Sequence, residues 1–230
     1  MSLGLWDIEL HNRLGSATQV NNSDIGVNGT ITDTVTYSPA KFDNGALSDA
    51  VTGFITFNPT ITNTNRFIME CWIKATAARA SYGFENVINV WDSSPIAVVK
   101  LVLRTTGTPG ILVQGFEGST LFDFTDTHSW VANELMHFLV VVDNTASFDG
   151  SKTVALYRNG IQTASSTAAF TFTGPWEEIT ACGRNGGLEL AGLSIVDGLK
   201  LYNEGAIPHI NDILQNRYNE FFGHARMIGG

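Results

Sequence analysis

The sequence is short of cysteine and of charged residues. Its 230 residues include two cysteines, Cys71 and Cys182. Because they form no C-x-x-C pair, neither a zinc knuckle nor a redox motif is indicated. Two free thiols are favoured over one long-range disulfide, since unpaired cysteine is commonly a buried apolar residue. Charged residues make up 15% against 43% hydrophobic residues, a composition that excludes a disordered chain and allows a full core.

Positive charge is scarcer than negative charge. The chain has 13 lysine and arginine residues against 22 aspartate and glutamate residues, which gives a net charge of −9. A basic stripe that could bind phosphate is missing, so nucleic acid is not expected as a partner. The acidic balance is compatible with cation binding, although an acidic surface also simply keeps proteins soluble.

Targeting and membrane segments are missing as well. The opening stretch, "MSLGLWDIELHNRLG", has neither a basic region nor a long apolar core, so no signal peptide is predicted. No stretch approaches the ~20 apolar residues that a membrane span needs. We therefore expect a protein that resides in a virus particle, or outside a cell by another route that needs no signal peptide, or otherwise in the cytoplasm.

Strand-like patterns fill most of the chain. Residues 1–36 are polar and predict loops with short strands, and strand after strand follows from residue 37. In "RFIMECWIKA" (66–75), alternate positions place four apolar side chains on one face: Phe67, Met69, Cys71 and Ile73. Ile68 and Trp72 fall on the other face. A strand with apolar residues on both faces is typical of the centre of a layered sheet.

Two local signals complete the prediction. "TVALYRNGIQTASS" (153–166) indicates a hairpin, because the Asn159-Gly160 pair suits a type I′ turn with positive φ at both central positions. Over 206–221 the apolar residues recur at intervals of three and four, with Pro208 in the first turn, which predicts a helix. No Ser, Thr, Asp or Asn cap stands directly before that range. We predict one domain over 1–230, an all-β, two-sheet antiparallel sandwich with one short C-terminal helix.

The order of these segments resembles the concanavalin A-like, laminin-G-like jelly-roll superfamily. The matching stretches include "YSPAKFDNGAL" (37–47), "FIMECWIKA" (67–75), "HFLVVVDNTAS" (137–147), the hairpin, and "LSIVDGLKLYNEGAIPHINDIL" (193–214). The resemblance implies that the last strand returns beside the N-terminal strand. It also implies that the helix caps the edge or end of the sandwich and packs its apolar stripe on the sheet. The Trp-His-His segment of the family is only partly present, because Trp130 lies seven residues before His137 and Phe138 follows.

The acid set of the hydrolases in this superfamily is missing. Those enzymes carry Glu-x-Asp-x-x-Glu on one strand, which points a nucleophile and an acid into one cleft. Asp7 and Glu9 have no third acid, and Glu177 and Glu178 are adjacent and would face opposite sides. We therefore predict that the protein is not an enzyme, and a glycoside hydrolase or lyase is disfavoured.

Two kinds of binding site are compatible with the resemblance. Relatives often hold Ca²⁺ at the rim of the sandwich, and Asp92, Asp43 and Asp197 are the candidate ligands. Against this, Asp43 belongs to an ordinary Asp-Asn-Gly turn, and Asp197 could simply hydrogen-bond a loop. Sugar binding needs aromatic rings beside polar side chains in loops. The candidates for that site are Trp91, Asp92, Trp130, Trp176, Arg184 and Asn185.

The sequence thus favours a non-catalytic recognition module, most simply a lectin-like domain whose partner is a glycan. The alternative is a structural or surface-decoration protein of a phage or virus particle, which would form a homo-oligomer or contact other virion proteins. An aromatic cleft would indicate the first role, and a symmetric oligomer would indicate the second.

Overall fold

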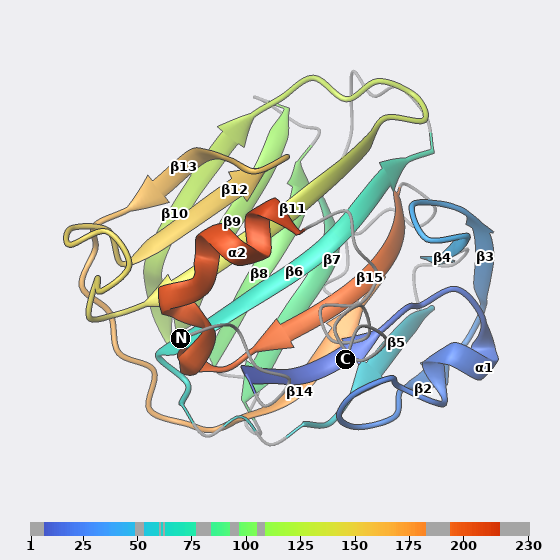
Figure 1. The fold of residues 1–230 in the computed structure, drawn as a ribbon, viewed down its shortest axis with the longest axis horizontal. Coiled ribbons are helices and arrows are strands. Elements are labelled where there is room, and N and C mark those ends of the chain that lie inside the picture. Colours follow the sequence, from blue (N-terminus) through green and yellow to red (C-terminus); the bar gives the residue numbers. More distant parts are fainter. Residues whose placement is uncertain are drawn as a thin grey trace, which may run out of the picture.

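The computed structural model describes residues 7–48, 53–59, 61, 63–76, 84–92, 97–104, 109–182 and 194–216. Within these ranges the chain forms two antiparallel sheets that pack face to face (Figure 1). The predicted all-β sandwich with a short C-terminal helix is therefore confirmed. In this part of the chain no helix is long and apolar enough to cross a membrane.

Sheet A has eight strands in the described part of the chain. In spatial order they are β13 (Ile161–Ser166), β12 (Val154–Arg158), β11 (Leu135–Asp143), β6 (Arg66–Ala75), β15 (Ser194–Tyr202), β4 (Asn44–Ser48) and β3 (Val35–Pro39), with β1 (Ile8–Asn12) also paired to β15. The last strand therefore does return beside the first one, as the resemblance implied.

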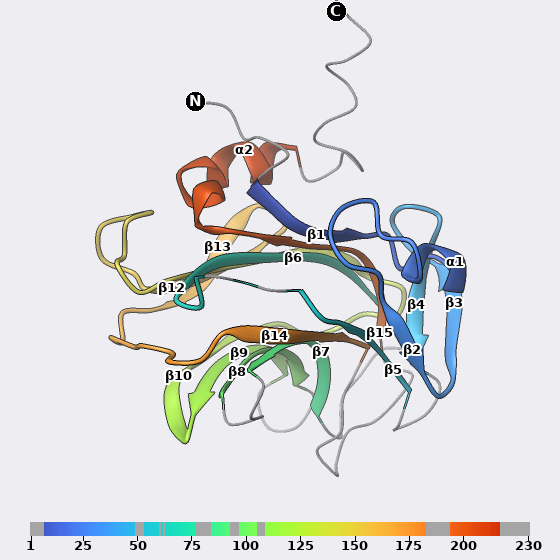
Figure 2. The same ribbon diagram turned by 90° about the horizontal axis from the view of Figure 1, so that it is seen from below.

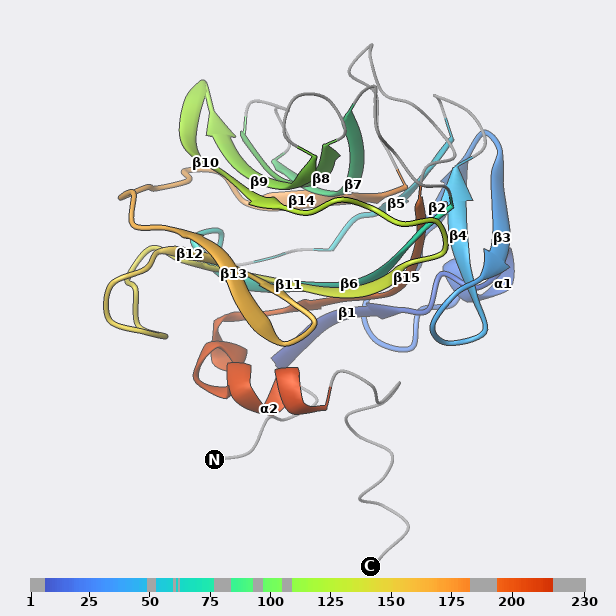
Figure 3. The ribbon, with the colours of Figure 1, turned by 90° about the horizontal axis from the view of Figure 1, so that it is seen from above.

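Sheet B has seven strands among the described residues. Their order is β10 (Ser119–Thr127), β9 (Gly110–Glu117), β8 (Ala97–Arg104), β7 (Phe84–Asp92), β14 (Trp176–Ala181), β5 (Phe54–Phe57) and β2 (Thr30–Thr32). Sheet B curls away from sheet A at β10 and β7, so that its outer face is the concave side of the sandwich (Figures 2 and 3).

The central strand β6 shows why two layers form. Its odd-numbered apolar residues, from Phe67 to Ile73, lie in the main core between the sheets. Ile68, on the opposite face, belongs to a second apolar cluster on the outer side of sheet A. The predicted two-faced central strand is therefore confirmed. Cys71 and Cys182 are both buried free thiols, which agrees with the reading that favoured no disulfide.

The C-terminal helix covers that second cluster rather than an edge of the sandwich (Figure 2). It starts as the 3₁₀ helix η2 (Glu204–His209) and continues as α2 (Ile210–Gln215). Asn203 caps it, because its side chain accepts a hydrogen bond from the Gly205 N–H. A cap therefore exists, slightly upstream of the predicted start. Among the described residues α2 ends at Gln215, and Asn216 at its C-cap donates to the Asp212 carbonyl from both its backbone and its side-chain N–H groups. The predicted range from 217 to 221 lies outside the described residues.

The hairpin follows its sequence signal, whereas the N-terminal segment adds a short helix to the predicted loops and strands. Asn159 and Gly160 have φ of 52° and 86°, as the predicted turn requires, and β12 pairs with β13 on either side. Within residues 1–36 the described part holds β1, the one-turn helix α1 (Ala17–Val20) and β2. Ser16 caps α1 by accepting a hydrogen bond from the Gln19 N–H.

Candidate binding face

A row of polar side chains crosses the outer face of sheet B. Strand register places its members opposite one another from edge to edge, in the order Thr30, Thr56, Thr180, Asn89, Lys100, Gln114 and Asp123. Residues on either side along each strand, such as Ile88 and Val90, lie in the main core. Because side chains alternate along a strand, the row must point away from the core. We call it the polar row.

The centre of the polar row is tightly hydrogen-bonded. Asn89 Nδ2 donates to Thr180 Oγ1 over 3.1 Å, and the indole N–H of Trp91 donates to the same oxygen over 3.3 Å. The Lys100 ammonium lies 5.4 Å from the centre of the Trp91 ring, within cation–π range. Asn89 and Thr180 are fully buried, whereas Trp91 is partly exposed. The face therefore offers an aromatic surface above a fixed polar centre.

The ends of the polar row are more open. Gln114 Nε2 donates to Asp123 Oδ2 over 3.4 Å between β9 and β10. Thr30 and Asp123, at the two edges, are exposed. The row is therefore closed to solvent at Asn89 and Thr180 and open towards its two edges.

The predicted sugar-binding residues do not gather at one place in the fold. Trp91 is on the polar face, and Asp92 follows it at the end of β7. Trp176 is fully buried, and its indole N–H donates to the Thr64 carbonyl over 2.8 Å. Trp130 is 4% exposed and packs edge-on against a histidine. In this conformation those two rings present almost no surface to a ligand. Arg184 and Asn185 lie outside the described residues.

Three residues of the polar centre were not anticipated from sequence: Asn89, Lys100 and Thr180. Two of them had a visible signal. Lys100 is the lone polar residue inside "AVVKLVL", and Asn89 alternates with apolar residues in "ENVINVW". Thr180 had none, because it reaches Trp91 only through the pairing of β14 with β7.

The predicted calcium ligands are divided between the two sheets, with Asp197 in sheet A and Asp92 at the end of a strand of sheet B. Asp197 is fully buried in sheet A, and its Oδ2 accepts hydrogen bonds from the backbone N–H groups of Lys41 and Phe42 at 2.8 and 2.7 Å. Its alternative role as a loop anchor is therefore confirmed. Asp43 sits exposed in that turn, whereas Asp92 is on sheet B. Across the described ranges, no three His, Cys, Asp or Glu residues gather as a metal site.

A second polar cluster is buried on the outer face of sheet A. Glu70 lies at its centre and accepts from His137 Nε2 over 3.0 Å, from Lys200 Nζ over 3.4 Å and from the Tyr202 hydroxyl. Burial raises the pKa of Glu70, but the Lys200 charge and the bonds from His137 and Tyr202 outweigh it and bring that pKa to about 2. All four side chains are almost inaccessible, so this cluster fastens strands rather than binding a ligand.

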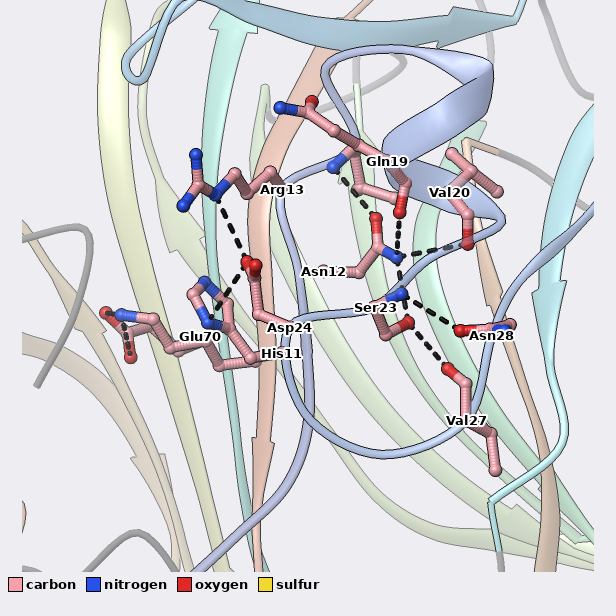
Figure 4. A network of polar contacts seen from close by, with 12 residues as sticks. His11, Asn12, Arg13, Gln19, Val20, Ser23, Asp24, Val27, Asn28 and Glu70 are labelled. Carbon is pink, nitrogen blue, oxygen red and sulfur yellow. Dashed lines mark hydrogen bonds and ion pairs between the residues drawn. The ribbon is translucent and has the colours of Figure 1, made fainter. Parts of the chain in front are cut away.

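The N-terminal loop is tied to this side of sheet A (Figure 4). Asp24 accepts from Arg13 Nε over 3.1 Å and lies 3.7 Å from His11 Nδ1, and Asn12 Nδ2 donates to the Gln19 carbonyl over 2.8 Å. Burial and the nearby Lys200 lower the pKa of His11 to about 4, against the opposing effect of Asp24. His11 is therefore neutral in the folded protein near pH 7.

These two depressed pKa values predict that the protein loses stability in acid. Since the pKa of folded His11, about 4, is below its ordinary 6.5, the unfolded chain binds more protons between these values. The stability that neutral His11 contributes is present above pH 6.5 and falls as the pH drops towards 4. The stability that ionised Glu70 contributes is present above pH 4.5 and is lost as the pH falls from 4.5 towards its folded pKa of about 2. Urea midpoints at about pH 7 and about pH 5 should differ less in His11→Asn than in the wild type. Equal differences would contradict the prediction.

Comparisons with known proteins bear on the fold. No protein-family model and no curated protein matches the sequence. Domain 4 of AbnA, a GH43 extracellular arabinanase from Geobacillus stearothermophilus, solved in complex with arabinotriose, matches with a TM-score of 0.65 and 16% identity over 89% of this chain and 98% of that chain. The chain shares the fold of this domain.

Two toxin domains match as well. The binding domain of Paraclostridial Mosquitocidal Protein 1 has a TM-score of 0.68 at 12% identity, over 93% of this chain and 53% of that chain. The botulinum neurotoxin serotype D binding domain gives 0.66 at 15% identity, over 92% and 52%. This chain thus spans about half the length of these two domains. Such identities show the fold alone, so membership of the concanavalin A-like superfamily and a place in a virus particle both stay predictions.

Proposed function

We propose that this protein is a non-catalytic binding module that holds a neutral glycan on the outer face of sheet B. The observation that carries the proposal is the polar row with Trp91 beside its centre. Sugar hydroxyls both donate and accept hydrogen bonds, which amide and hydroxyl side chains match. The apolar C–H face of a sugar ring can lie on the exposed part of an indole. Support comes from the similar AbnA domain, which was solved with arabinotriose.

The charges on this face favour binding over hydrolysis. Among the described residues, alternation along the strands brings the carboxylates of Glu178 and Asp123 to the outer side. Four strand spacings separate β14 from β10, about 19 Å at ~4.8 Å each, whereas glycosidases hold their two carboxyl groups roughly 5–9.5 Å apart. These two carboxylates outnumber the one cation of the polar row, Lys100, and this balance disfavours an anionic glycan, so the proposal names a neutral one.

A polysaccharide panel tests this function. Calorimetric titration with arabinan, xylan, mannan and β-glucan, and with polygalacturonic acid as the acidic comparison, should give binding to at least one neutral polymer. Trp91→Ala should weaken that binding about tenfold or more, because it removes the stacking surface. Ile161→Ala, which trims a side chain 70% exposed on sheet A, is the matched control and should bind normally. Absence of wild-type binding to every neutral polymer would contradict the proposal.

A further inference from the structure

A second row of side chains runs beside the polar row on the outer face of sheet B. Strand register places Trp91 of β7 opposite Val98 of β8, and Val98 opposite Phe116 of β9. Each of the three is two residues away from a member of the polar row on its own strand. Because side chains alternate along a strand, all three turn to the same face as the polar row. We call these three residues the apolar row.

The outward direction of Phe116 has an independent check. A Cβ added at Gly115 would lie 2.3 Å from the ring of Phe122, which belongs to the main core. Gly115 therefore faces the core, and its neighbour Phe116 faces outwards. Phe116 and Trp91 are both partly exposed, whereas Val98 between them is 3% exposed. A ligand can thus reach the two aromatic rings from solvent.

The spacing of the two rings is longer than one sugar. Trp91 and Phe116 stand two strands apart, which separates their backbones by ~9.6 Å at ~4.8 Å per strand spacing. A sugar in an extended glycan advances the chain by about one strand spacing. Alternate sugars of such a chain would therefore lie on the two aromatic rings, and the sugar between them would lie over Val98.

Members of the polar row lie along one side of this path. Lys100 and Gln114 are each two residues from a member of the apolar row, and both are partly exposed. The Lys100 ammonium lies 5.4 Å from the centre of the Trp91 ring, so a hydroxyl of a sugar on that ring can accept from it. Gln114 offers its side-chain amide two residues before Phe116 on the same strand. Each aromatic ring therefore has a polar group beside it that suits sugar hydroxyls.

Among the described residues, neither end of the apolar row is closed by a buried side chain. The register continues from Trp91 to Glu178 on β14 and from Phe116 to Thr120 on β10. Glu178 is partly exposed and Thr120 is exposed. A chain that lies on the two rings can therefore continue past both of them, a geometry that suits the interior of a polymer rather than its end.

We propose that the ligand is the interior of an extended neutral glycan that crosses β7, β8 and β9, with alternate sugars stacked on Trp91 and Phe116. This inference rests on the proposed function and narrows it from one sugar on Trp91 to a chain of at least three sugars. Phe116 is then a second specificity-determining residue, because a ligand shorter than this span contacts one ring only.

Chain length and the Phe116 ring are the two variables of the test. The probes are linear oligosaccharides of one to six sugars from the neutral polymer of the panel that binds best. Phe116→Leu removes the ring but keeps an apolar side chain, whereas Phe116→Tyr keeps the ring. Phe148→Leu, at the second apolar cluster on sheet A, is the matched control. Calorimetric titration gives the affinity, and the melting temperature reports whether each variant is folded.

We expect the wild-type affinity to rise about tenfold or more from the disaccharide to the tetrasaccharide. Phe116→Leu should bind the tetrasaccharide and the polymer about tenfold more weakly, because the second stacking surface is lost. It should bind the disaccharide almost normally, since the larger Trp91 ring is still present. Phe116→Tyr and Phe148→Leu should bind like the wild type.

Equal wild-type affinity for the disaccharide and the tetrasaccharide would overturn the inference, and this measurement requires no variant to fold. Normal tetrasaccharide binding by Phe116→Leu would overturn it as well. Both results leave the proposed function intact as long as the polymer still binds and Trp91→Ala weakens that binding. Failure of the wild type to bind any neutral polymer would instead overturn the proposed function itself, so the two failures are distinguishable.

Discussion

Replacing Glu70 with leucine is expected to lower the free energy of unfolding by about 3–5 kcal/mol. Glu70 is 1% exposed, and it is the partner of the equally buried Lys200 and His137. Removing one member of a buried ion pair leaves the other charged and uncompensated away from water. The cost falls on the middle of sheet A, because Glu70 joins β6 to β11 and β15. Urea unfolding at neutral pH, followed by circular dichroism, measures it.

A double variant separates lost charge balance from lost packing. Glu70→Leu combined with Lys200→Met removes both charges and keeps similar volume, which is often neutral or stabilising for buried ion pairs. We expect it to recover a large part of the stability lost in the single variant. If Glu70→Leu alone unfolds within about 1 kcal/mol of the wild type, the cluster does not fasten the strands as described.

Replacing Trp176 with alanine is expected to cost about 3–5 kcal/mol, the usual range for a large aromatic residue removed from a core. The ring is 0% exposed, lies 4.8 Å from Phe172 and 6.1 Å from Phe67 between ring centres, and bonds Thr64 through its N–H. The substitution opens a cavity where sheet B faces sheet A. Trp176→Phe, which keeps most of the volume, is the matched variant and should lose less.

Trp91→Ala is expected to weaken binding more than it lowers stability, whereas Trp176→Ala chiefly lowers stability. Its ring is partly exposed on the outer face of sheet B, so its removal should change the free energy of unfolding less than Trp176→Ala does, while affinity for the glycan falls. Urea unfolding and calorimetric binding, measured on both variants, distinguish the core residue from the residue that contacts the ligand. Comparable destabilisation by the two substitutions would contradict the assignment of one to the core and the other to the face.

Local sequence pattern was enough to predict the fold class, the central strand, the hairpin and the C-terminal helix. Period-two alternation placed Phe67 and Ile68 on opposite faces of β6 because a strand turns its side chains over at every residue. Asn159 and Gly160 predicted the hairpin because few residue pairs tolerate positive φ at both positions. The helix was found from its apolar spacing, but its ends depended on Asn203 and Asn216, whose side-chain bonds no periodicity reports.

The candidate site was decided by tertiary structure. Trp91 could be proposed from sequence because a tryptophan beside polar residues is visible locally. Its environment could not, since Asn89, Lys100 and Thr180 come from three strands whose order and register arise only when the sheet forms. Likewise, Trp91 and Trp176 look alike in the sequence. Which one faces solvent depends on the side of sheet B to which each side chain turns, and the packing of sheet A against one of those sides settles it.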